Sequence, residues 1–130
     1  MMETQELYQK ARKAAEGSYS PYSNFRVGAV VVADDGRVFT GANIENAAYP
    51  ASSCAEATAI NTAAAAGVRK IETVAVACVD AAEVDGAYPC GRCRQIMSEF
   101  DVETVLVTAG PGTEEREHTL DELLPYRFSL

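Results

Sequence analysis

The stretch FRVGAVVVADDGRVFTGAN, residues 25–43, decides the fold that we expect for this chain. Two apolar and β-branched runs flank Asp-Asp-Gly, and Asp-Gly between such runs is a strong signal for a β-hairpin. Farther along, the apolar runs IETVAVACV (71–79) and ETVLVTA (103–109) are separated by a segment typical of a helix. A hairpin followed by strands that alternate with helices predicts an α/β layered domain.

Helices are predicted on both faces of this sheet. Strong helix formers, periodic apolar residues and glycine stops mark four segments, residues 3–16, 54–66, 91–100 and 120–128. Residues 115–120 are predicted as a last edge strand, and the later strands are expected to run parallel, joined by right-handed helical crossovers. The expected fold is a three-layer α/β/α sandwich with a mixed sheet of about five strands, formed by residues 1–130 as a single domain.

Composition and charge narrow the class of protein. Hydrophobic residues make up 48% of the 130 residues and charged residues 23%, which is typical of a globular chain that needs no disulfides to fold. The formal net charge is −8, and no basic stripe is present. This balance argues against binding to nucleic acid and suits a small neutral substrate.

The chain shows no pattern of membrane insertion or export. Its longest clean apolar run, VGAVVVA at residues 27–33, is too short to span a bilayer, and its first residues do not resemble a secretory signal. We therefore expect a cytoplasmic protein with no membrane partner. Cysteines stay reduced in that compartment, where they are better interpreted as metal ligands or catalytic groups than as a disulfide framework.

Three cysteines indicate a metal centre. Cys90 and Cys93 are one helical turn apart, and Cys54 lies at the start of another predicted helix. Three thiolates with one open position describe a zinc site, and the positive ends of two helices would lower the thiol pKa values. If neither Cys78 nor His118 supplies a fourth ligand, water takes that position and the site is catalytic. Glu56 is then near enough in sequence to exchange protons with that water.

Each of these residues also has a plainer interpretation. Glu56 follows Ser53 by three positions, which is the spacing of a helix capping box. A lone C-x-x-C motif is compatible with a redox pair or with half of a structural zinc knuckle. Cys78, inside an apolar strand, is expected to be a buried free cysteine, and His118, in a charged segment, a solvated surface histidine. It is the combination of the two cysteine motifs that favours a catalytic zinc site.

The predicted helix over residues 54–66 carries small and apolar side chains on nearly all sides, with no charge after Glu56. A helix of this kind needs burial on all sides, and a domain of 130 residues offers little room for that. We therefore expect another subunit to cover part of this helix.

Five stretches, in this order, resemble one known family: YSPYSNFRVGA, GANIENAAYP, CAEATA, PCGRCRQ and ELLPYRF. C-A-E followed by P-C-x-x-C resembles the zinc nucleoside deaminases, and the chain is most similar to the small, homotetrameric, three-cysteine cytidine deaminases. The resemblance implies zinc-dependent hydrolysis of cytidine and 2′-deoxycytidine to uridine and 2′-deoxyuridine with release of ammonia, a reaction of pyrimidine salvage. It also implies a homotetramer with shared active sites and one zinc ion per subunit.

The same resemblance assigns roles to individual residues. It implies that zinc is bound by Cys54, Cys90 and Cys93, and that Glu56 protonates N3 of cytosine and later the departing amine. It implies that the nucleoside is held by the backbone N–H of Ala55, by Asn43 and Glu45 at the ribose, and by the aromatic residues Phe25, Tyr49 and Phe128. Tyr49 and Phe128 would act across a subunit boundary. Without the resemblance, Asn43 and Glu45 are more typical of a loop that satisfies its own backbone.

One position departs from the family pattern. Many three-cysteine members read C-A-E-R, where the arginine helps to neutralise the thiolates, and this chain has Ala57 there. More negative charge then stays on the metal, which should raise the pKa of its water. We hypothesise that Arg92 or Arg94, on either side of Cys93, compensates by hydrogen bonding a thiolate.

Other functions stay open at this point. PCGRCRQ also resembles deaminases of cytosine-containing antibiotics such as blasticidin S. A non-catalytic zinc module predicts a closed set of four ligands, and a thiol redox protein that uses Cys90 and Cys93 predicts activity without metal. A polynucleotide deaminase is a further alternative, which the acidic net charge opposes.

Overall fold

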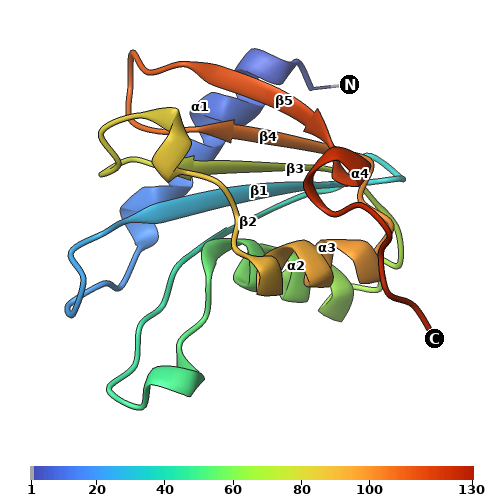
Figure 1. Ribbon diagram of the computed structural model, residues 1–130, viewed down its shortest axis with the longest axis horizontal. Helices are drawn as coiled ribbons and strands as arrows, with labels where there is room; N and C mark the ends of the chain where they lie inside the picture. The colour runs from blue at the N-terminus through green and yellow to red at the C-terminus, as the bar shows by residue number, and fades with distance from the viewer. Residues whose placement is uncertain (1) are drawn as a thin grey trace.

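In the computed structural model, which describes residues 2–130, five strands form one mixed sheet in the order β2-β1-β3-β4-β5. The strands are β1 (Val27–Ala33), β2 (Val38–Ala42), β3 (Ile71–Cys78), β4 (Thr104–Thr108) and β5 (Glu115–Thr119) (Figure 1). β1 and β2 pair antiparallel across a turn in which Gly36 has φ +90°. The hairpin predicted from Asp-Gly is therefore confirmed.

The direction of each strand follows from its connection. β3 and β4 pair in parallel, and α3 (Gly91–Glu99) lies between them in the chain, as the alternation of strand and helix predicts. β4 and β5 pair antiparallel. The prediction that the later strands run parallel is therefore wrong for β5, because residues 109–114 are too few for a parallel crossover.

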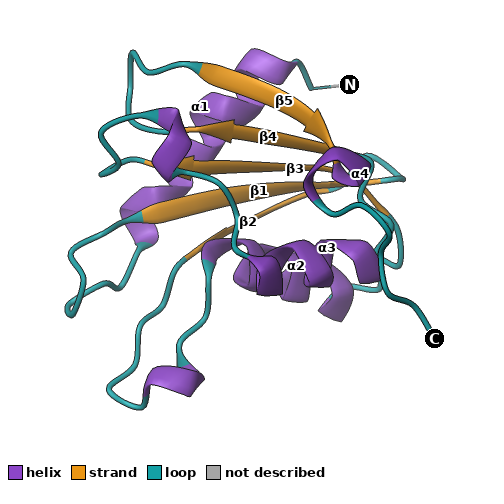
Figure 2. Ribbon diagram, viewed as in Figure 1, coloured by secondary structure: helices purple, strands orange, loops and turns teal. Residues whose placement is uncertain are grey.

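Helices cover both faces of the sheet and complete the predicted three layers. α1 (Thr4–Ala14) lies on one face, while α2 (Ala55–Ala65) and α3 lie on the other (Figures 1 and 2). The face under α1 buries a small cluster that includes Leu7, Val30 and Leu106. The larger core lies on the α2 and α3 side, where Ile60 and Met97 are fully buried.

The C-terminal helix is shorter than predicted. α4 spans Leu120–Leu123 rather than residues 120–128. Thr119 and Glu122 open it with a capping box, and Pro125 and Tyr126, which has φ +54°, prevent further helical turns. Residues 124–130 therefore follow α4 as an irregular C-terminal tail (Figure 1).

Two glycines let the helices pack directly against the strands. A Cβ atom at Gly28 of β1 would overlap the backbone of α1 at Ala11 O. A Cβ atom at Gly41 of β2 would lie 2.5 Å from Ala59 N and 2.9 Å from Ala55 O, both in the backbone of α2. Because only glycine permits these approaches, the position of α2 over the sheet depends directly on Gly41.

Part of α2 and two irregular segments near it remain exposed in a single chain. One side of α2 is exposed, so a single chain does not bury this helix on all sides. The exposed residues are Asn61, Thr62 and Ala65. The segment 43–53 projects away from the sheet and carries Tyr49 at 88% exposure, and the C-terminal tail carries Phe128 at 67% exposure (Figure 1). Among the described residues, none of the helices has the length and apolar character that crossing a bilayer requires.

Candidate metal centre

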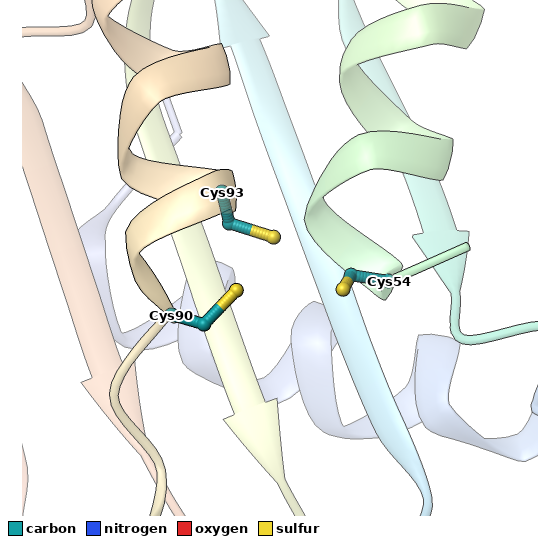
Figure 3. A group of neighbouring side chains, drawn as sticks. All are labelled: Cys54, Cys90 and Cys93. Carbon is teal, nitrogen blue, oxygen red and sulfur yellow. The ribbon is translucent and has the colours of Figure 1, made fainter. Parts of the chain in front are cut away.

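Two neighbouring helix N-termini bring three cysteines together. Cys54 is the N-cap residue of α2, Cys90 is the N-cap residue of α3, and Cys93 lies in the first turn of α3. Their three Sγ atoms all lie within 4.8 Å of one another (Figure 3). Sequence patterns predict each cysteine to lie at a helix start, and the packing of α2 against α3 brings the two starts side by side.

The chemistry of this donor set fits a zinc ion. Zn–S bonds of about 2.3 Å in a tetrahedral site place the sulfurs about 3.8 Å apart, so the observed grouping needs only small side-chain adjustments. The N-termini of α2 and α3 add positive potential that stabilises thiolates. Cys93 is buried, Cys54 is half-buried and Cys90 is exposed, so the cluster opens to the surface beside Cys90.

Neither candidate for a fourth protein ligand belongs to the group of three sulfurs. Cys78 is buried at the end of β3, and its Sγ donates to Ala87 O at 3.6 Å, while burial raises its thiol pKa to about 12. His118 is half-buried, and its Nε2 lies 2.8 Å from the Tyr88 hydroxyl. Cys78 is thus a buried free cysteine as expected, whereas the expectation of a solvated surface His118 is wrong.

The sulfurs share charge and protons unequally. A hydrogen bond from the Cys93 thiol and the positive charge of Arg92 lower the pKa of Cys54 to about 6. The same hydrogen bond, together with burial, raises the pKa of Cys93 far above its ordinary value. Within this pair, the thiolate form of Cys54 and the thiol form of Cys93 are therefore favoured.

The two arginines of the PCGRCRQ motif have different partners. Arg92 faces Cys54, where its charge and its N–H groups favour the thiolate. Arg94 instead donates from Nε to Pro89 O at 2.8 Å and from Nη1 to Leu123 O at 2.7 Å. Arg92 is therefore the cation placed to compensate for Ala57, which is fully buried at the start of α2.

Glu56 lies in the first turn of α2, directly after Cys54 and Ala55, and is only 5% exposed. Burial raises its carboxyl pKa to about 7, and the nearby Cys54 adds to this rise. The capping box with Ser53 is not formed, because the N-cap residue of α2 is Cys54 and no side chain caps the helix. A buried carboxyl with a pKa near neutrality beside a metal site is well suited to exchange protons with a substrate.

The two ribose candidates are both engaged within their own chain. The Asn43 amide donates to Phe25 O at 2.8 Å and accepts from Val27 N at 2.9 Å and from Ser18 Oγ at 2.6 Å. Glu45 accepts from Tyr22 N at 3.0 Å and from the backbone N–H and hydroxyl of Ser23. These contacts hold the loop before β1 against the projecting segment, and they leave one amide hydrogen of Asn43 available.

The remaining candidates lie at different distances from the cysteines. Ala55 is buried at the N-terminus of α2, between Cys54 and Glu56, and Phe25 packs against the core below that helix. Tyr49, in the projecting segment, and Phe128, in the C-terminal tail, both have exposed rings in the single chain.

One part of the site was not predicted from the sequence. Tyr88 and His118 pack with ring centroids 5.3 Å apart, and Arg116 Nη1 donates to the Tyr88 hydroxyl at 3.2 Å. An aromatic residue directly before Pro-Cys-x-x-Cys, together with the single histidine of the chain, was the available signal. Nothing in the sequence places β5 next to the loop that carries Tyr88.

The site combines three thiols at two helix starts with a buried carboxyl beside them, within a three-layer α/β/α domain. This combination defines a zinc-dependent hydrolase. Residues 1–109 match the family described as "Cytidine and deoxycytidylate deaminase zinc-binding region". The chain therefore belongs to this family of zinc-binding deaminases. It is 42% identical over 131 residues to a cytidine deaminase of Sporosarcina psychrophila, with 98% of this chain and 93% of that relative covered.

Solved structures agree with this assignment. The cytidine deaminase from Burkholderia pseudomallei superposes with a TM-score of 0.88 at 40% identity, covering 98% of this chain and 100% of that one. The cytidine deaminase from Mycobacterium tuberculosis gives a TM-score of 0.80 at 36% identity, with 100% of both chains covered. The predicted family and fold are confirmed, and the zinc-binding region of the family together with the three cysteines fits one zinc ion per subunit.

Proposed function

We propose that this protein deaminates cytidine and 2′-deoxycytidine hydrolytically, giving uridine or 2′-deoxyuridine and ammonia. The observation that carries the proposal is the three Sγ atoms within 4.8 Å of one another, with buried Glu56 two residues after Cys54. Cytidine deaminases that cover nearly the whole chain at 40% identity or more support the same substrate class. Residues 1–130 would act as one deaminase domain.

Cys54, Cys90 and Cys93 would hold the zinc ion. When bound, the ion supplies hydroxide at neutral pH, because zinc lowers the pKa of water to about 7. Cys90, the most exposed of the three, lies where a substrate would approach the cluster. Cys93 lies on the buried side of the cluster, and the N-termini of α2 and α3 stabilise the negative charge of the thiolates.

Glu56 would move the protons of the reaction. With a pKa of about 7 before metal is bound, its carboxyl can be found in either protonation state near neutrality. The carboxylate would accept a proton from water and deliver it to N3 of cytosine as C4 is attacked. The hydroxyl now on C4 would then give its proton to Glu56, which would pass it to the amine. The C4–N4 bond would break as the C4=O bond forms, and ammonia would leave.

Other residues would hold the nucleoside in place. The backbone N–H of Ala55, at the start of α2, would donate to the base carbonyl, and Phe25 would pack against the base. The free amide hydrogen of Asn43 would donate to a ribose hydroxyl, and Glu45 would accept from one. Since Glu45 already accepts from Ser23, ribose binding would share its two oxygens between the loop and the sugar.

A homotetramer with shared active sites would cover the surfaces that one chain leaves exposed. The exposed side of α2, Tyr49 on the projecting segment and Phe128 on the tail are the parts that a neighbouring subunit would bury. Tyr49 and Phe128 would then contribute to the site of a neighbour. We place the protein in the cytoplasm, because the three metal-binding cysteines must stay reduced, and we expect no nucleic acid among its partners.

The test is to mix the zinc-loaded protein with cytidine and to follow ammonia release together with the absorbance change of the base. Glu56→Gln should retain one zinc ion per chain and lose nearly all turnover, by about 10³-fold or more. Initial rates on 2′-deoxycytidine and on blasticidin S, measured side by side, decide between a nucleoside deaminase and an antibiotic deaminase. Turnover of blasticidin S alone, or full activity in Glu56→Gln, would overturn the proposal.

A further inference from the structure

The three residues that precede Cys90 are each held by a different part of the fold. The Cys78 thiol of β3 donates to Ala87 O. The hydroxyl of Tyr88 contacts His118 of β5, and Pro89 O accepts from Arg94 of α3. The chain that leads into the metal cluster is therefore tied to two strands and to the helix that follows it.

Tyr88 makes the most elaborate of these contacts. Arg116 donates to its phenol oxygen at 3.2 Å, which leaves the phenol hydrogen to donate to Nε2 of His118 at 2.8 Å. Arg116 is itself fixed by ion pairs with Asp85 at 2.7 Å and Glu114 at 2.8 Å. The half-buried Tyr88 ring also packs against the main core. Two side chains of β5 thus set the position of this one hydroxyl.

Cys90 is the cysteine that most needs such support. Cys93 is buried within α3 and Cys54 is half-buried, whereas Cys90 is exposed, and as the N-cap residue it receives no side-chain hydrogen bond from its helix. Its position depends on the backbone that enters α3, and Tyr88 is two residues upstream. Side chains that orient metal ligands from outside the ligand set typically change metal affinity about 10- to 100-fold when they are lost.

We propose that Tyr88, held by His118 and Arg116, is a positioning residue that keeps Cys90 in place for the metal ion. The proposal rests on the proposed zinc site and extends it. Its chemical consequence is slow release of zinc from the site. The hydrogen-bond partners of the hydroxyl are His118 and Arg116 and not the three sulfurs or the carboxyl of Glu56, so its loss changes metal retention rather than the proton transfers.

The test compares zinc release from matched tyrosine variants. Wild type, Tyr88→Phe and Tyr8→Phe are loaded with zinc and mixed with an excess of a chromophoric zinc chelator. Tyr88→Phe should release zinc about five to ten times faster than wild type. Tyr8→Phe is the control. The Tyr8 hydroxyl also binds Arg116, since it donates to the Arg116 backbone oxygen at 2.8 Å, but Tyr8 belongs to α1 on the opposite face of the sheet. Its release rate should stay within about twofold of wild type.

A second variant separates the pair from a general loss of stability. His118→Phe should release zinc faster than wild type but no faster than Tyr88→Phe, which also loses the Arg116 contact. The double variant should be no faster than Tyr88→Phe, since the Tyr88–His118 hydrogen bond is already absent there. Multiplied effects in the double variant, wild-type release from Tyr88→Phe, or equally fast release from Tyr8→Phe would each overturn the proposal. A wild-type protein that retains no zinc would overturn the zinc site as well, so the two failures are distinguishable.

Discussion

Replacing Gly41 by alanine should disturb the metal centre from the opposite side of α2. The added Cβ would lie 2.5 Å from Ala59 N and 2.9 Å from Ala55 O, whereas ordinary contacts begin at 3.4 Å. Because both neighbours are helix backbone, neither can rotate away, and α2 must move by about 0.9 Å at Ala59. Overpacking of this kind costs about 1–3 kcal/mol, which corresponds to a Tm lower by about 4–12 °C for a chain of this length.

The same displacement should reach the zinc site, since α2 starts at Cys54 and carries Glu56. Metal–ligand distances tolerate changes of only about 0.2 Å, so a shift of α2 should weaken zinc binding about tenfold or more. Gly28→Ala is the matched control, because its Cβ overlaps α1 on the other face of the sheet. It should lower Tm at least as much as Gly41→Ala while zinc affinity at 25 °C stays close to wild type.

The assay combines thermal unfolding, followed by circular dichroism, with zinc competition against a chelator of known affinity. The two variants should lose stability together but differ in zinc affinity. If Gly41→Ala keeps both the Tm and the zinc affinity of wild type, or if Gly28→Ala loses zinc equally, the proposed dependence of the site on the position of α2 is refuted.

Two further predictions follow from the charges at the site. In metal-free protein, Glu56→Gln should be as stable as wild type near pH 4.5 and more stable at pH 8, by on the order of 3 kcal/mol, because the folded carboxyl has a pKa of about 7 instead of 4.5. The wild type loses this part of its free energy of unfolding as pH rises from about 4.5 to 7. Urea unfolding of both proteins at pH 4.5 and pH 8 measures the loss. A stability difference between the two proteins that does not change with pH would contradict the effect of burial on Glu56. Arg92→Gln should raise the pKa of Cys54, so alkylation of the metal-free thiol by iodoacetamide at pH 6.5 should slow about twofold. Arg94→Gln, which lacks that contact, serves as the control, and equal slowing in both variants would show that Arg92 has no special role.

Local patterns predicted much of the fold and the metal ligands. Asp35 and Gly36 required a tight hairpin turn, and helix formers after Cys54 and Cys90 placed both cysteines at helix starts. The short connection after β4 is a local feature too, and its few residues explain why β5 turns back antiparallel. The terminal helix ends at Leu123, earlier than predicted, because Pro125 stops the helix that the residues before it favour.

Contacts between distant segments could not be predicted in the same way. The Tyr88–His118 pair joins residues 30 positions apart, and the Arg94 contact with Leu123 joins residues 29 positions apart. Such pairs depend on the order of strands and on loop paths, for which no local propensity exists. Asn43 illustrates the same limit, because its sequence neighbours do not reveal that its amide binds both Phe25 and Val27.

X-ray absorption at the zinc edge of the loaded protein tests the central claim most directly. With Cys54, Cys90 and Cys93 as ligands, the spectrum should require three sulfur neighbours at about 2.3 Å and one oxygen neighbour at about 2.0 Å. Cytidine or an unreactive analogue should alter the oxygen shell and leave the sulfur shell unchanged. Four sulfur neighbours, or three sulfurs with a histidine nitrogen, would mean a closed structural site and would contradict a deaminase built on these residues.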